Sequence, residues 1–101
     1  MRLFRAVRDA EREDLLAKGH LRNPVGYEVK YFTKTGEEAE RYARMAEQAY
    51  QDGPYHLVQA EIDDVRVTDD MIVDVDAGLR AVILPDDLLQ HVRQAVLIGR
   101  V

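Results

Sequence analysis

The residues with the clearest chemical potential are an arginine in one predicted strand and aromatic and hydroxyl side chains in another. Arg5 stands in the alternating segment LFRAV, and Tyr31, Phe32 and Thr33 stand in the segment VKYFT. An arginine that faces a cleft can give two hydrogen bonds to one phosphate, because its guanidinium is a planar fork. An aromatic ring on a neighbouring strand can stack on a nucleobase or a nicotinamide. Together these residues could form a site for a phosphate-bearing ring compound.

A purely structural role explains the same residues. Arg5 can lie at a sheet edge with its charge in solvent, while Tyr31 and Phe32 fill the core and its rim. On the pattern alone, we favour this structural role. An arginine between two apolar residues on one strand face is nevertheless unusual in so small a domain.

Several other chemistries are excluded by the residue types that the chain lacks. It contains no cysteine and no serine, so a disulfide, a thiolate zinc site and a serine or cysteine nucleophile are excluded. His20, His56 and His91 are too far apart for a helical zinc motif, and the six glycines stand singly rather than in a phosphate-binding loop. The acids from Asp63 to Asp76 are better explained as solvated turns than as an ion site. We therefore expect no metal site.

The length and charge of the chain restrict its class. Its 101 residues predict a single domain over residues 1–101, and an apolar content of 47% is enough for one core. The net charge of −5 disfavours nucleic acid as a partner, because a duplex-binding protein needs a broad basic field. No apolar run approaches the roughly 20 residues that span a bilayer. The sequence thus predicts a soluble, cytoplasmic protein with no membrane partner.

The first predicted helix covers residues 9–18. Asp9 is its expected side-chain cap, and Gly19 ends it. Leu15 and Leu16 are its expected core contacts.

The second predicted helix follows Thr35 and runs to about residue 51. Thr35 and Glu38 have the spacing of a capping box, a hydroxyl at the cap and a carboxylate three residues later. Small and aromatic residues follow at steps of three and four and form one stripe, which is expected to face the core. They are Ala39, Tyr42, Ala43, Ala46, Ala49 and Tyr50.

Strands account for most of the remaining chain. The predicted strands are residues 3–7, 29–33, 55–62, 71–75, 79–84 and 96–98. A short helix is expected after Pro85, over Leu88, Leu89 and Val92. Because the helices come early and the strands late, the order predicts an α+β fold with a small mixed or antiparallel sheet and two main helices. We expect the first two strands in one sheet.

Five segments of the chain resemble a known family. They are LFRA at residues 3–6, LLAKG at 15–19, KYFTKT at 30–35, YA at 42–43 and GLRAVILPDDLL at 78–89. In type and order they are similar to the small ADP-ribosyltransferase-like domains found at the ends of bacterial polymorphic toxins and as short free-standing bacterial proteins. The resemblance implies an ADP-ribosyltransferase-like fold.

The resemblance also implies NAD as the bound substrate and gives the matching residues roles. Arg5 in the first strand would bind the NAD phosphates or ribose. Tyr31, Phe32 and Thr33 in the second strand would shape the nicotinamide pocket. In this family a Glu or Gln on a late strand holds the ribose 2′-hydroxyl and stabilises the oxocarbenium-like transition state.

The chain departs from the family at that late strand. Residues 79–84 are LRAVIL and contain no carboxylate. Without it, a large electrostatic contribution to the transition state would be lost. Glu28, just before the second strand, and Asp76, just before the late strand, could each take its place. Glu28 is our candidate catalytic residue, because the preceding loop would put it at the cleft rim; its structural alternative is a pair with Lys30.

Three functions stay open on this basis. The first is an enzyme that cleaves NAD or transfers ADP-ribose, with a target or an immunity protein as partner. The second is a non-catalytic module of the immunity or adaptor type that binds a nucleotide or a protein. The third is a small structural domain. The missing carboxylate favours the second function, and Arg5 beside the aromatic-hydroxyl strand favours the first.

Overall fold

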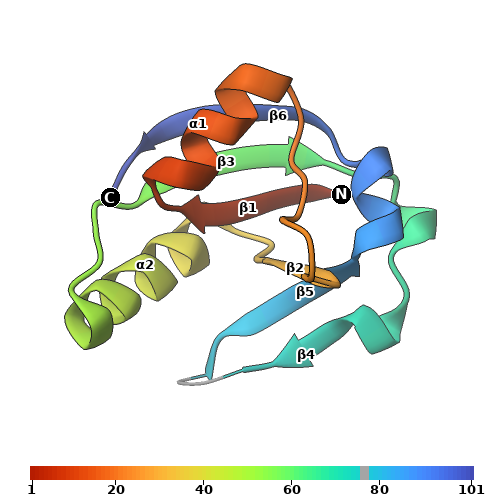
Figure 1. Cartoon of the computed structure of the whole chain (residues 1–101). Coiled ribbons are helices and arrows are strands. Elements are labelled where there is room, and N and C mark those ends of the chain that lie inside the picture. The colour runs from red at the N-terminus through yellow and green to blue at the C-terminus, as the bar shows by residue number, and fades with distance from the viewer. Residues whose placement is uncertain (76–77) are drawn as a thin grey trace.

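The computed structural model describes residues 1–75 and 78–101. The strands are β1 (Arg2–Val7), β2 (Val29–Phe32), β3 (His56–Glu61), β4 (Ile72–Asp74), β5 (Arg80–Pro85) and β6 (Arg93–Arg100). The helices are α1 (Asp9–Lys18) and α2 (Gly36–Tyr50), with 3₁₀ helices at Asp64–Arg66, Asp69–Met71 and Asp86–His91. The predicted α+β class with two main helices is therefore confirmed (Figure 1).

The strands form two antiparallel sheets rather than one. Their orders are β1-β3-β6 and β2-β5-β4 (Figure 1). Within the described residues, β1 is paired to the end of β2 only through Phe4 and Thr33, which exchange two backbone hydrogen bonds of 2.8 Å. The expectation of one sheet is thus wrong, because alternation along a strand defines its faces but not its neighbour.

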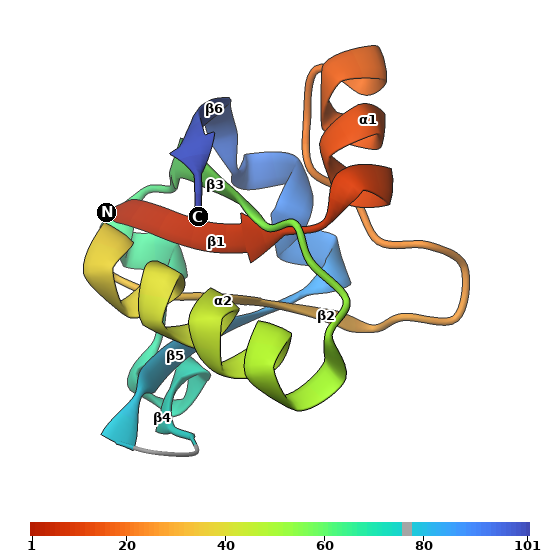
Figure 2. The ribbon, with the colours of Figure 1, turned by 90° about the vertical axis from the view of Figure 1, so that its left-hand side faces the viewer.

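The main core lies between the two sheets. Leu3 and Val58 of the first sheet belong to the same buried cluster as Phe32 and Val82 of the second, and Leu15 of α1 joins them. The alternate face of the first sheet packs against α2 in a second cluster. The two helices therefore lie on opposite sides of β1, as Figure 2 shows.

Helix α2 begins as predicted. The Thr35 hydroxyl accepts a hydrogen bond from the Glu38 backbone at 3.2 Å and donates one to the Glu38 carboxylate at 2.9 Å. Ala39, Ala43 and Ala46 are buried against the first sheet, as expected.

The prediction that the whole stripe on α2 faces the core is wrong for three of its residues. Tyr42, Ala49 and Tyr50 are exposed. The three buried alanines bring the helix close to the sheet. The large rings next to them therefore remain at the edge of the contact.

The cap and the core contacts of helix α1 differ in part from the prediction. Gly19 ends it in the left-handed conformation, with φ of 79°, as predicted. Asp9 does not cap it: the residue at the cap position is Arg8, and an Asp9 carboxylate oxygen lies 2.8 Å from Nε2 of His56. Leu15 is buried, but Leu16 is 61% exposed, because this helix turns only one narrow face to the protein.

The C-terminal part differs in detail from the prediction. The short helix after Pro85 is a 3₁₀ helix that buries Leu89, and Val92 follows it into the core. Leu88 packs only partly against that core. Strand β6 is longer than expected and forms an edge of the first sheet. No helix in the described ranges is long and apolar enough to cross a membrane.

Candidate functional site

Arg5 connects the first sheet with the second sheet and with helix α1. Its Nε and Nη2 donate to the two carboxylate oxygens of Glu11 at 2.7 and 2.8 Å, and its Nη1 donates to the Tyr31 carbonyl at 2.8 Å. The guanidinium thus links β1, α1 and β2 just beyond the Phe4–Thr33 pairing. The side chain is only 23% exposed, so it does not extend into bulk water.

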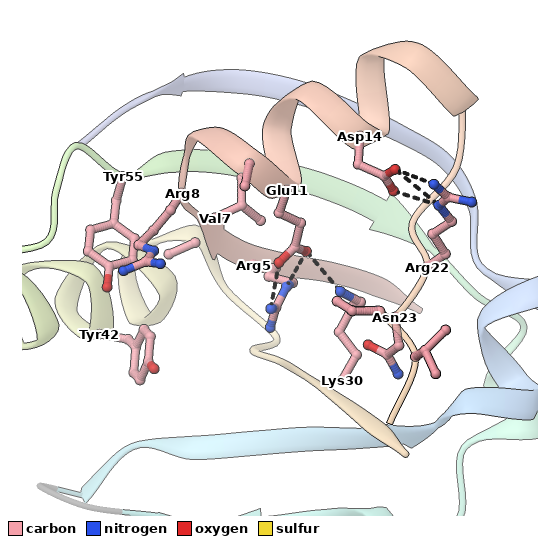
Figure 3. Close-up of a pocket in the computed structure, with 14 residues that line it drawn as sticks. Arg5, Val7, Arg8, Glu11, Asp14, Arg22, Asn23, Lys30, Tyr42 and Tyr55 are labelled. Atoms are coloured by element: carbon pink, nitrogen blue, oxygen red, sulfur yellow. Dashed lines mark hydrogen bonds and ion pairs between the residues drawn. The ribbon is translucent and has the colours of Figure 1, made fainter. Parts of the chain in front are cut away.

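Lys30 reaches the same carboxylate from β2. Its Nζ donates to Oε2 of Glu11 at 3.0 Å, and its side chain is only 3% exposed. Figure 3 shows Arg5 and Lys30 pointing toward Glu11, which extends from α1. One carboxylate therefore holds two cations, so this cluster carries one excess positive charge.

Burial and ion pairing act against each other within the cluster. Burial raises the pKa of Glu11, but the hydrogen bonds and charges of Arg5 and Lys30 outweigh it and hold that pKa below its ordinary value. The pKa of Lys30 is lowered, chiefly by burial and next by the charge of Arg5, while Glu11 acts in the opposite direction. Glu11 is therefore ionised at neutral pH, and its negative charge favours the protonated form of Lys30.

A cavity of about 630 Å³ adjoins this cluster, and we call it the α1 cavity (Figure 3). Its charged lining residues are the cations Arg5, Arg8, Arg22 and Lys30 and the acids Glu11 and Asp14. Arg22 has Asp14 as its own partner and Arg8 has Asp52, each at 2.7 Å. Among the described residues, the lining therefore carries four positive and two negative charges, a local reversal of the net charge of −5.

A second cavity of about 600 Å³ lies beside α2, and we call it the α2 cavity. Five of the seven aromatic residues of the chain line it: Phe4, Tyr31, Phe32, Tyr42 and Tyr50. Arg5 is its one charged lining residue among those that the structure describes. The two cavities share Arg5, Ala6 and Tyr42, so a cationic space adjoins an aromatic one.

The structure brings four of the residues predicted for the site together. Arg5, Tyr31, Phe32 and Thr33 all line the α2 cavity. Phe32 is buried, whereas Tyr31 is 49% exposed, and the Thr33 hydroxyl donates to the Thr35 carbonyl at 2.8 Å.

Glu28, the candidate catalytic carboxylate, does not join these residues. The Glu28 side chain is exposed and lines neither cavity, while its backbone carbonyl accepts a hydrogen bond from the Asp86 amide at 2.8 Å. Lys30, its expected structural partner, pairs with Glu11 instead. Asp76 lies outside the described residues.

Sequence reasoning missed Glu11 and Lys30. Glu11 is one of several acids in the first turns of α1, and nothing in its type distinguishes it from them. Lys30 did carry a signal, because it shares a strand face with Phe32, and a lysine on a buried face requires a carboxylate from elsewhere.

No group of three or more histidine, aspartate or glutamate side chains in residues 1–75 and 78–101 could hold a metal ion. Comparison with protein-family models, with curated proteins and with solved structures finds no match for this chain.

Proposed function

We propose that this chain binds NAD at the junction of the two cavities, as the ADP-ribosyltransferase-like domains that it resembles do. The observation that carries the proposal is the contact between a cationic cavity and an aromatic one at Arg5 and Tyr42. A dinucleotide has the matching chemistry, since planar heteroaromatic rings are joined through a charged pyrophosphate. Each cavity has the volume typical of small-ligand sites, about 300–1,000 Å³.

The aromatic side chains support the ring-binding half of the proposal. Tyr31 is half-exposed at the α2 cavity, where a nicotinamide can stack on its face. Phe32, buried beside it, supplies a rigid wall.

Arg5 supports the phosphate-binding half. Three of its hydrogen bonds go to Glu11 and to the Tyr31 carbonyl, one each from Nε, Nη1 and Nη2. A guanidinium has five N–H groups, so one N–H on each terminal nitrogen is left for a ligand. The three existing bonds hold the fork in place before a ligand arrives, which lowers the entropy cost of binding.

Cleavage of NAD defines the enzymatic form of this proposal. The bond between the ribose C1′ and the nicotinamide nitrogen breaks, and its electron pair leaves with nicotinamide. Water or a target group then adds to C1′ and loses one proton to solvent. A carboxylate near C1′ would stabilise the developing positive charge. Glu28 is the candidate for this role.

A second candidate function is NAD binding without cleavage, by a module of the adaptor or immunity type. The exposed position of Glu28 outside both cavities favours it.

Calorimetric titration with NAD, followed by an assay for released nicotinamide, tests both candidates. Saturable binding is expected, and Arg5→Lys should weaken it nearly as much as Arg5→Ala, because both lose the planar fork. If the folded protein does not bind NAD, the proposal fails.

The nicotinamide assay then separates the two functions. Release that is lost in Glu28→Gln supports the enzyme with Glu28 as its electrostatic stabiliser, since the change keeps the shape and removes the charge. Release that Glu28→Gln leaves intact rules out Glu28 in that role. Binding with no release identifies the non-catalytic module.

A further inference from the structure

The buried lysine on β2 is unusual, because lysine is rarely this buried and its carboxylate partner is shared with Arg5. Lys30 is 3% exposed and occupies a strand position whose neighbour on the same face, Phe32, is in the core. Burying an ammonium carries a large desolvation penalty, and an apolar residue at such a position is often at least as stabilising. Lys30 thus carries a charge that can act on a ligand as well as on Glu11.

Lys30 and Arg5 together hold the uncompensated charge of the α1 cavity. Both donate to the one carboxylate of Glu11, at 2.7 to 3.0 Å. The other cations on the wall have carboxylates of their own, Asp14 for Arg22 and Asp52 for Arg8. The excess positive charge is therefore localised at one point, between β1 and β2.

We propose that Arg5 and Lys30 act as a paired cation site for phosphate oxygens in the α1 cavity, with Glu11 as the residue that positions both. The identity of the ligand as a dinucleotide pyrophosphate rests on the proposed function. The site itself rests on the contacts above. Arg5 offers the two N–H groups that its present bonds leave, and an ammonium has three N–H donors, of which Glu11 takes one.

Glu11 positions the cations because it contacts them from a third element. Its two oxygens fix the guanidinium plane of Arg5, and Oε2 also receives the bond from Lys30. A competing role is simple neutralisation, in which Glu11 weakens anion binding by its charge. The two roles predict opposite effects of removing the carboxylate.

The first experiment is calorimetric titration with inorganic pyrophosphate at constant ionic strength. Lys30→Met keeps the length of the side chain and removes its charge, and it should weaken binding about tenfold or more. Arg22→Gln is the matched comparison, because Arg22 lines the same cavity but is already paired with Asp14. Its loss should be at most about threefold.

Three results would overturn this proposal: no binding of pyrophosphate by the folded wild type, unchanged binding in folded Lys30→Met, or an equal loss in Arg22→Gln. An equal loss in Arg22→Gln would indicate that the whole cationic lining attracts the anion, rather than the pair of Arg5 and Lys30.

Glu11→Gln is the second test and does not depend on the folding of Lys30→Met. If Glu11 positions the pair, pyrophosphate binds about tenfold more weakly to this variant. Lys30 faces Glu11 and Asp14 of α1 and Arg5 of β1, so loss of the Glu11 charge should lower the pKa of Lys30 further. As the pH is raised above neutral, pyrophosphate binding should therefore be lost at a lower pH in Glu11→Gln than in the wild type. Tighter binding, or an unchanged pH profile, would overturn the positioning role.

Titration with NAD separates this inference from the proposed function. Pyrophosphate binding that needs Lys30, without NAD binding, supports the cation pair and rejects the NAD function. NAD binding that is equal in wild type and Lys30→Met supports the function and rejects the pair.

Discussion

The two helices of this protein lie on opposite sides of β1 and are attached by different forces. Helix α2 is held by the small apolar residues Ala39, Ala43 and Ala46, which are all buried. Helix α1 buries only Leu15 and is otherwise held by polar contacts, chiefly those of Glu11 with Arg5 and Lys30. Apolar contacts depend little on salt and pH, whereas ion pairs depend on both. The contrast therefore marks the α1 side as the part of the fold that responds to ions.

The largest expected effect is on the apolar side. Ala43→Glu would bury an unpaired carboxylate between α2 and the first sheet, and should lower the free energy of unfolding by about 3 kcal/mol or more. Urea denaturation measures this. Ala49→Glu puts the same residue on an exposed position of the same helix and should change stability by about 0.5 kcal/mol or less. Equal stability of the two variants would mean that α2 does not pack through this stripe.

The polar side should give a smaller effect at neutral pH. Glu11→Gln leaves Arg5 and Lys30 without a counter-charge and should cost about 2 kcal/mol, less than for a fully buried pair because Glu11 is partly exposed. Glu13→Gln, on an exposed position of the same helix, is the matched control. The same urea denaturation measures both, and a loss no greater than the control's would show that α1 is not held by this cluster.

The cost of Glu11→Gln should also depend on pH, with a sign that follows from the lowered pKa of Glu11. A carboxyl whose folded pKa is depressed stabilises the fold fully above its unfolded pKa, about 4.5. That stabilisation disappears as the pH falls through the folded value. The difference in unfolding free energy between wild type and Glu11→Gln should therefore shrink below about pH 4.5. A difference that stays constant to pH 3 would refute the ion-pair account.

Much of the local structure could be predicted from the sequence. The Thr35–Glu38 capping box and the end of α1 at Gly19 depend on neighbouring residues, so the chain itself carries their signals. The division into two sheets could not be predicted, because it depends on which distant strands pair. The site was predictable only in part for the same reason. Arg5 and Tyr31 were found by residue type, whereas the contact of Glu11 with Lys30 joins elements that only the tertiary fold brings together.

The smallest predicted effect concerns a polar contact near the end of α2, between Tyr55 and Asp52. The Tyr55 hydroxyl donates to Asp52 at 2.9 Å, and burial together with this carboxylate raises the pKa of Tyr55 to about 12. Tyr55→Phe should cost about 1 kcal/mol at neutral pH. Because the folded pKa is raised, this contribution is present below about pH 10 and is lost as the pH rises toward 12. Spectrophotometric titration of wild type and Tyr55→Phe checks the raised pKa. The two titration curves should differ by the ionisation of one tyrosine near pH 12.

A ligand is expected to bind beside Arg5, where the cationic α1 cavity adjoins the aromatic α2 cavity. Titration of the isotopically labelled protein with NAD, followed by backbone amide NMR, shows whether it does. Binding at this position should produce saturable shifts of the amides of Arg5, Tyr31 and Thr33, with little change along the outer strand β6. Shifts confined to β6, or none at saturating NAD, would contradict it.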